Sequence, residues 1–96
     1  MRLEWDPKKD QANFKKHGVT FGEASKLFGS NVEYLELYDA AHSHTEDRFI
    51  AIGPIRRGLV LVVYTERTED ALRIISARWA TPGEARLYTE YLKEHS

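Results

Sequence analysis

The fold of this chain is decided by one stretch, Leu72-Arg73-Ile74-Ile75-Ser76-Ala77-Arg78-Trp79-Ala80-Thr81-Pro82-Gly83-Glu84. It predicts a β-strand that is followed at once by a helix. Thr81 is a typical N-cap, Pro82 fits the first helical position, where no N–H is needed, and Glu84 completes a capping box. Strict alternation places Arg73 and Arg78 on opposite faces of the strand, unless a β-bulge intervenes. Hydrophobic burial does not explain arginines inside a strand, so they are the first candidates for function.

The remaining elements are marked by caps, glycines and apolar periodicity. Asp6-Pro7 opens a first helix that Gly18 ends, and a capping box that begins at Thr20 opens a second helix that Gly29 ends. Four segments with the composition of strands follow, and we expect them at residues 32–38, 48–53, 59–66 and 71–80. A final helix is expected at residues 82–94. Short loops between successive strands favour an antiparallel meander.

This order of elements, α-α-β-β-β-β-α, predicts the fold class. We expect one α+β domain over residues 1–96, with two layers and a four-stranded antiparallel sheet that has helices against one face. The other face of the sheet would then be free to bind a ligand.

Composition limits the classes of function. The chain has no cysteine, which excludes disulfides and thiolate metal sites. No apolar run approaches the roughly 20 residues of a membrane helix, and the first residues lack the apolar core of a signal peptide, so we expect a cytoplasmic protein with no membrane partner. The net charge of −1 gives no general case for nucleic-acid binding, but residues 48–79 carry six Lys and Arg against three Asp and Glu. A local basic segment of this kind suits a polyanion.

Four arginines lie in or beside the predicted strands, at Arg48, Arg67, Arg73 and Arg78. Guanidinium groups keep their charge and bind phosphates in a bidentate manner, so several on one sheet face would suit a phosphodiester. The alternative is that each arginine forms an ion pair at the rim of the sheet, with Glu66, Glu69, Asp70 or Glu84 as partner.

If the reaction is RNA cleavage, a base must take the 2′-hydroxyl proton and an acid must protonate the leaving 5′-oxygen. His17, Glu66 or Lys16 could fill these roles, with the arginines as the phosphate clamp. His17 has an alternative role as a favourable partner of the helix dipole. His42 and His44 form a close pair that could bind a metal, but no carboxylate-rich ligand set surrounds them, and an exposed loop is the alternative.

Several blocks of the sequence together resemble one known family. They are Trp5-Asp6-Pro7, residues 13–24, Arg48, Ile52-Gly53, residues 61–67 and residues 73–80, in this order. The chain resembles the BrnT toxins over about residues 5–91.

The resemblance implies a RelE-like fold and a bacterial type II toxin that is a metal-independent endoribonuclease, with no cofactor, and that inhibits translation. Its partners would be RNA and a BrnA-like ribbon-helix-helix antitoxin, in a heteromeric complex that reaches operator DNA only through the antitoxin. We predict Arg67, Arg78, Glu66 and His17 as catalytic residues. Arg48, Arg73 and Lys16 are predicted to bind RNA, and no metal site is expected.

One position departs from the family pattern. Relatives usually carry basic residues where this chain has Pro82-Gly83, which lowers the local positive charge. The alternative function is therefore a toxin-like binding module without catalysis, which would act with its antitoxin as a co-repressor.

Overall fold

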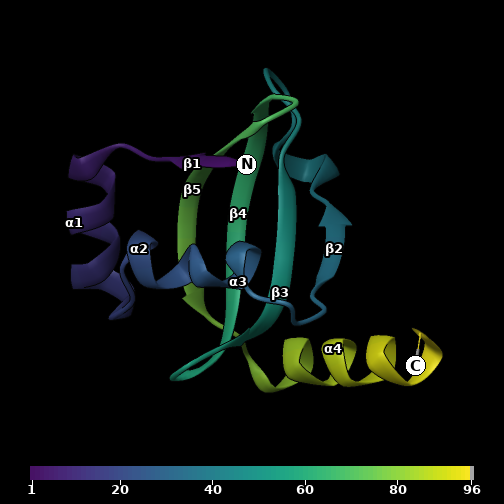
Figure 1. The fold of residues 1–96 in the computed structure, drawn as a ribbon. Helices are drawn as coiled ribbons and strands as arrows, with labels where there is room; N and C mark the ends of the chain where they lie inside the picture. Colours follow the sequence, from purple (N-terminus) through teal and green to yellow (C-terminus); the bar gives the residue numbers. More distant parts are fainter. Residues whose placement is uncertain (96) are drawn as a thin grey trace.

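The computed structural model describes residues 1–95, and its centre is a five-stranded sheet (Figure 1). The strand order is β1-β5-β4-β3-β2. The bounds are Arg2–Glu4 for β1, Leu35–Tyr38 for β2, Phe49–Ile55 for β3, Gly58–Thr68 for β4 and Ala71–Trp79 for β5. Strands β2 to β5 form the antiparallel meander that the sequence predicts.

The prediction of a four-stranded antiparallel sheet is wrong, because the N-terminus adds strand β1. This strand runs parallel to β5, and Arg2, Leu3 and Glu4 pair with Ala71, Leu72 and Arg73 respectively. The sheet is therefore mixed. Three residues are too few to show an alternating pattern, and a pairing partner about 70 positions away leaves no local signal.

The helices follow the predicted caps, with one exception. Helix α1, Pro7–His17, begins after Asp6 and ends at Gly18, whose φ of 74° is the left-handed conformation that glycine adopts most easily. The second predicted helix is instead two short helices, α2, Phe21–Ala24, and α3, Lys26–Gly29. Ser25 separates them, and its hydroxyl donates a 2.6 Å hydrogen bond to the carbonyl of Gly22, which competes with regular helix geometry.

The last helix, α4, covers Pro82–His95, and a short 3₁₀ helix, η1, covers Ala40–His42 between β2 and β3. The capping box predicted for α4 is present in both directions. Glu84 N–H donates to Thr81 Oγ1 at 3.2 Å, and Thr81 N–H donates to Glu84 Oε1 at 2.9 Å. No helix of residues 1–95 has the length and the apolar character that crossing a bilayer requires.

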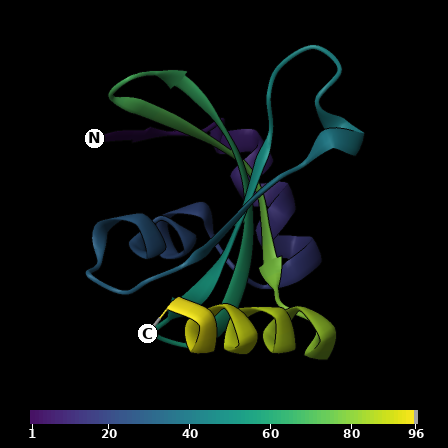
Figure 2. The same cartoon turned by 90° about the vertical axis from the view of Figure 1, so that its right-hand side faces the viewer.

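The core lies on both faces of the sheet, which corrects the prediction that helices cover one face only. On the first face, Val60, Val62 and Tyr64 of β4 pack against residues of α2 and α3, such as Phe21 and Leu27. On the second face, a smaller cluster joins Ile52 and Leu61 to Tyr88 of α4. Figure 2 shows α2 and α3 on one side of the sheet and η1 on the other, with α4 across one end. The second face is thus only partly covered.

Candidate functional site

A β-bulge in β5 decides where the arginines of this strand point. Val63 of β4 pairs with Ser76, but the next residue, Tyr64, pairs with Ile74, so Ile75 is an extra residue. A bulge of this kind resets the alternation of the side chains. The apolar residues of β5 on both sides of the bulge, Ile74 and Ala77, therefore share the first face. Arg73 and Arg78 consequently lie on one face, the second, where strict alternation would separate them.

A cleft of about 340 Å³ opens on the second face, next to the start of α4. Strands β3, β4 and β5 form its apolar floor with Ile50, Leu61, Val63 and Ile75. Its polar lining comes from four segments of the chain and consists of Asp39, His42, Arg48, Ser76, Arg78 and Glu84. An apolar floor beneath a few convergent charged groups is the usual form of a ligand site.

Arg78 stands at the end of the cleft and is held by Glu84. Its Nη1 and Nη2 atoms donate to Glu84 Oε1 and Oε2, both at 2.8 Å, and Nη1 also donates to the carbonyl of Trp79 at 3.3 Å. The hydrogen bonds from Arg78 are the largest cause that lowers the pKa of Glu84, to about 2, and those same bonds raise the pKa of Arg78. Glu84 is therefore a permanent counter-ion of Arg78. For Arg78, the structure thus shows the ion pair with Glu84 that the sequence offered as the alternative to a phosphate-binding role.

Arg48 immediately precedes β3 and lines the cleft. Its backbone is fixed at two points, because its N–H donates to Ser43 Oγ at 3.0 Å and its carbonyl accepts from Asp39 N–H at 2.8 Å. The nearest carboxylate contact is loose, at 3.8 Å between Nη2 and Glu46 Oε1. The Nε atom is buried and finds no hydrogen-bond partner within residues 1–95. A buried donor without a partner is costly. The Arg48 side chain as a whole is 33% exposed, so the outer part of its guanidinium group can bind an anion in the cleft.

His42 and Asp39 form a second charged pair on the wall of the cleft. His42 Nδ1 lies 3.0 Å from Asp39 Oδ2 and 3.2 Å from Asp39 Oδ1. The two residues lie at the ends of the turn that η1 forms. Ser43 stabilises this turn, because its hydroxyl donates to the Asp39 carbonyl at 2.6 Å. The His42 side chain remains 69% exposed, so most of the imidazole ring is open to solvent.

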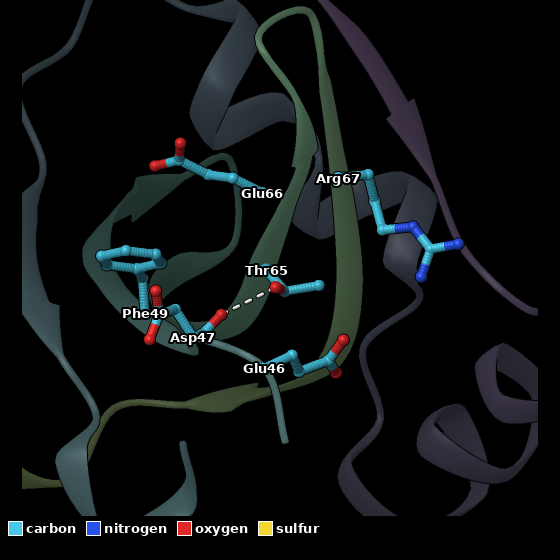
Figure 3. A pocket seen from close by; sticks show the side chains of 6 residues that line it. All are labelled: Glu46, Asp47, Phe49, Thr65, Glu66 and Arg67. Atoms are coloured by element: carbon cyan, nitrogen blue, oxygen red, sulfur yellow. Dashed lines mark hydrogen bonds between the residues drawn. The ribbon is translucent and has the colours of Figure 1, made fainter. Parts of the chain in front are cut away.

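The predicted residues Arg67 and Glu66 lie elsewhere, at the far end of β4. A second bulge between Glu66 and Thr68 makes Arg67 an extra residue. Its Nε lies 3.8 Å from Glu4 Oε1 of β1. Figure 3 shows Glu66 and Arg67 extending from opposite sides of the strand. Glu66 lies on the face that carries Tyr64, beside Tyr34 and Glu36.

The hollow in Figure 3 is larger than the cleft, at about 550 Å³, but its charge is unsuitable for a polyanion. Glu46, Asp47 and Glu66 line it together with Arg67 alone as a cation. The carbonyl of Asp47 is already used, because it accepts a 2.7 Å hydrogen bond from the Thr65 hydroxyl. Three carboxylates against one guanidinium repel phosphate, so the smaller cleft is the better candidate.

The remaining predicted residues are distributed as follows. Arg48 and Arg78 line the cleft. Arg73 lies further along the same face, opposite Thr65 of β4. Lys16 and His17 belong to the last turn of α1, which contacts β5, and neither lines the cleft.

Sequence reasoning missed the Asp39–His42 pair as part of the site. His42 was considered only with His44 for a metal. Within residues 1–95, no group of three or more His, Cys, Asp or Glu side chains is placed to hold a metal ion. The available signal was the spacing of Asp39 and His42, which are three residues apart, but the place of this loop is set by contacts that are distant in sequence.

Comparisons with known proteins agree with this architecture. The family model of the ribonuclease toxin BrnT of type II toxin-antitoxin systems matches residues 5–84. The crystal structure of the Brucella abortus ribonuclease toxin BrnT is similar, with a TM-score of 0.63 and 27% sequence identity over 84% of this chain and 97% of that chain. No curated protein sequence matches. The chain thus belongs to the BrnT family of ribonuclease toxins of type II toxin-antitoxin systems.

Proposed function

We propose that this protein is an endoribonuclease toxin that cleaves RNA in the cleft on the second sheet face, without a metal or another cofactor. The observation that carries the proposal is the convergence of Arg48 and Arg78 on one cleft, with Arg73 on the same face. Cleavage of RNA in the cytoplasm would inhibit translation. The RelE-like description of the fold remains a prediction.

The cleft supplies what a phosphodiester needs. Arg48 presents a partly exposed guanidinium with only a loose carboxylate contact, and Arg78 presents a guanidinium that Glu84 keeps in one orientation. Two guanidinium groups in one cleft, of which Glu84 holds that of Arg78, stabilise the negative charge that builds up on the phosphoryl oxygens during cleavage. Arg73 would contact the backbone of the RNA further along the sheet, and Lys16 is proposed as an additional phosphate contact.

His17, Glu66 and Arg67 remain predictions as catalytic residues. Glu66 and Arg67 lie at the other end of β4, so a direct role would require that the RNA extends along the strand from the cleft. Variants of Arg78 and Arg67 therefore distinguish the cleft from the end of β4 as the reaction site.

The experiment is induction of the chain alone in a bacterium, with growth and total RNA as readouts. We expect growth arrest and RNA fragments with the wild-type chain, and relief with Arg78→Ala. Arg56→Ala is the matched control, because Arg56 is exposed on the β3–β4 turn. Relief by Arg67→Ala but not by Arg78→Ala would place the reaction at the end of β4. Normal growth with abundant soluble wild-type protein would overturn the proposal, and loss of purified activity in a chelator would overturn its metal independence.

We further propose that a BrnA-like ribbon-helix-helix antitoxin neutralises the toxin and carries it to operator DNA. Co-expression with the product of the neighbouring reading frame should restore growth and give a complex that copurifies.

The second candidate function is a non-catalytic co-repressor. The Arg78–Glu84 ion pair favours it, since Glu84 removes part of the positive charge that RNA would meet. Purified protein that binds the antitoxin but leaves RNA intact would support this function over the first.

A further inference from the structure

We propose that His42 is the general base of the cleavage reaction and that Asp39 is its positioning residue. This inference rests on the proposed ribonuclease function and adds a residue that the sequence did not identify for this role. It is carried by the geometry of the pair and by its place on the wall of the cleft that Arg48 and Arg78 line.

Asp39 determines which ring nitrogen of His42 can act. A carboxylate only accepts hydrogen bonds, so the contact of 3.0 Å from Asp39 Oδ2 requires that Nδ1 carries the proton. In the neutral ring, Nε2 then holds the free lone pair. This nitrogen belongs to an exposed side chain, so it can accept a proton from a substrate hydroxyl.

The position of Asp39 is itself fixed by hydrogen bonds within the β2–β3 connection. Its N–H donates to the carbonyl of Arg48 at 2.8 Å, and its own carbonyl accepts from the Ser43 hydroxyl at 2.6 Å. The same Ser43 oxygen accepts from Arg48 N–H at 3.0 Å. Asp39, which orients the proton acceptor, is thus connected to the backbone of one phosphate-binding arginine by one backbone hydrogen bond and by two hydrogen bonds through the Ser43 hydroxyl, which limits relative movement of the two residues.

The reaction follows from these positions. The guanidinium groups of Arg48 and Arg78 bind the scissile phosphate, and Nε2 of His42 takes the proton of the adjacent 2′-hydroxyl. The 2′-oxygen forms a bond to phosphorus as the bond from phosphorus to the 5′-oxygen breaks. The 5′-oxygen takes a proton from water, and the imidazolium returns its proton to solvent. The products are a 2′,3′-cyclic phosphate and a 5′-hydroxyl, so atoms and charge balance.

The test is single-turnover cleavage of an RNA oligonucleotide by the purified full chain. We expect that His42→Ala slows cleavage by about 10²–10⁴-fold, as general bases usually contribute. Binding of an RNA analogue with methylated 2′-hydroxyls should stay within about twofold, and added imidazole should restore part of the rate. His44→Ala is the matched control, because His44 is exposed in the same loop and does not line the cleft.

Two further measurements separate base, acid and structural roles. An RNA whose leaving 5′-oxygen is replaced by sulfur needs no acid, so it should not rescue His42→Ala; full rescue would assign His42 as the acid and overturn the proposal. Asp39→Asn should slow cleavage at least tenfold in the wild-type background. It should have no additional effect in the His42→Ala background, because Asp39 acts through His42.

The outcomes distinguish this inference from the proposed function. If the wild-type chain cleaves RNA and His42→Ala cleaves equally well, the base assignment is overturned while the ribonuclease function stands. If the wild-type chain does not cleave RNA, both are overturned. Unchanged thermal unfolding of His42→Ala shows that any loss of rate is not a loss of fold.

Discussion

The side-chain amide of Asn13 binds the backbone of Ala77 as another strand would. Its Nδ2 donates to the Ala77 carbonyl at 2.8 Å, and the Ala77 N–H donates to its Oδ1 at 3.1 Å. The same Nδ2 donates to the Val19 carbonyl at 3.0 Å. Strand β1 pairs with β5 only at residues 71–73, so beyond that point α1 protects the edge of the sheet.

We therefore expect Asn13→Ala to be strongly destabilising. Asn13 is only 8% exposed, and its removal leaves three backbone groups without their partner, which costs about 2–4 kcal/mol in the free energy of unfolding. Urea unfolding measures this value. Gln11→Ala on the exposed side of α1 is the control, with an expected change below about 0.5 kcal/mol. Equal effects of the two substitutions would contradict the role of Asn13 at the sheet edge.

Glu84→Gln should lower stability in a manner that depends on pH. The pKa of Glu84 is depressed in the folded state, from its usual 4.5 to about 2, chiefly by the hydrogen bonds from Arg78. Because this pKa is depressed, the ionised carboxylate of Glu84 stabilises the folded state fully above pH 4.5, and this contribution disappears as the pH falls towards 2. Because the Arg78 side chain is 38% exposed, solvent reduces the effect to about 1–2 kcal/mol at pH 7.

Urea unfolding of wild type and Glu84→Gln at pH 7 and at pH 3 tests this. The difference between the two proteins should be largest at pH 7 and should shrink at pH 3. A difference that stays constant between these pH values would show that the charge of Glu84 is not responsible.

Gly53→Ala should destabilise through overpacking. A Cβ at this position would lie 2.7 Å from Leu27 Cδ1 and 2.9 Å from Tyr34 Cβ, closer than carbon atoms approach. Leu27 Cδ1 is the end of a flexible side chain, but Tyr34 Cβ can move only with the backbone of the segment before β2, so we expect a loss of about 1–3 kcal/mol in the free energy of unfolding. Gly29→Ala is the control, because its Cβ would meet nothing within 4 Å. A Gly53→Ala protein as stable as the Gly29→Ala protein would contradict this packing.

Arg73 and Arg78 should both contribute to RNA binding, since the bulge at Ile75 places them on one face. For single strands, each phosphate contact contributes about 0.7 to the slope of log affinity against log salt. We expect Arg73→Gln and Arg78→Gln each to reduce this slope by about 0.7 and the affinity by about tenfold. Binding of a 2′-O-methylated RNA, measured by fluorescence anisotropy between 50 and 200 mM salt, checks the prediction.

Arg56→Gln provides the comparison for these two arginines, because it removes the same charge from the exposed β3–β4 turn. If it changes the slope as much as Arg73→Gln does, the second face has no special role in binding.

Local signals predicted most of the elements. The Thr81–Glu84 capping box and the left-handed Gly18 each involve residues close in sequence, and both are present. Strand β1 could not be predicted, because its three residues become a strand only through pairing with β5. The break at Ser25 was missed for a different reason, since the hydrogen bond from the serine hydroxyl to the Gly22 carbonyl is local but the apolar pattern around it is that of one continuous helix.

The site was harder to predict than the fold. Arg48 and Arg78 were recognised by residue type, and the structure places both in one cleft. His42 was not recognised as part of this cleft, because residues 39–47 have no apolar periodicity from which the direction of a side chain could be predicted. Its orientation depends on the pairing of Asp39 with Arg48 across the β2–β3 connection. Side chains in such loops become interpretable only when the partners are known.

The bulge at Ile75 makes the count of residues in β5 as important as their identity. Arg73 and Arg78 are five positions apart, an odd number, which in a regular strand means opposite directions. The extra residue Ile75 shifts the alternation by one, so both arginines lie on the second face of the sheet. A deletion of one residue between them would leave every arginine in the sequence and still move one across the sheet. In this strand, an insertion or deletion changes the placement of charge as decisively as the substitution of a charged residue.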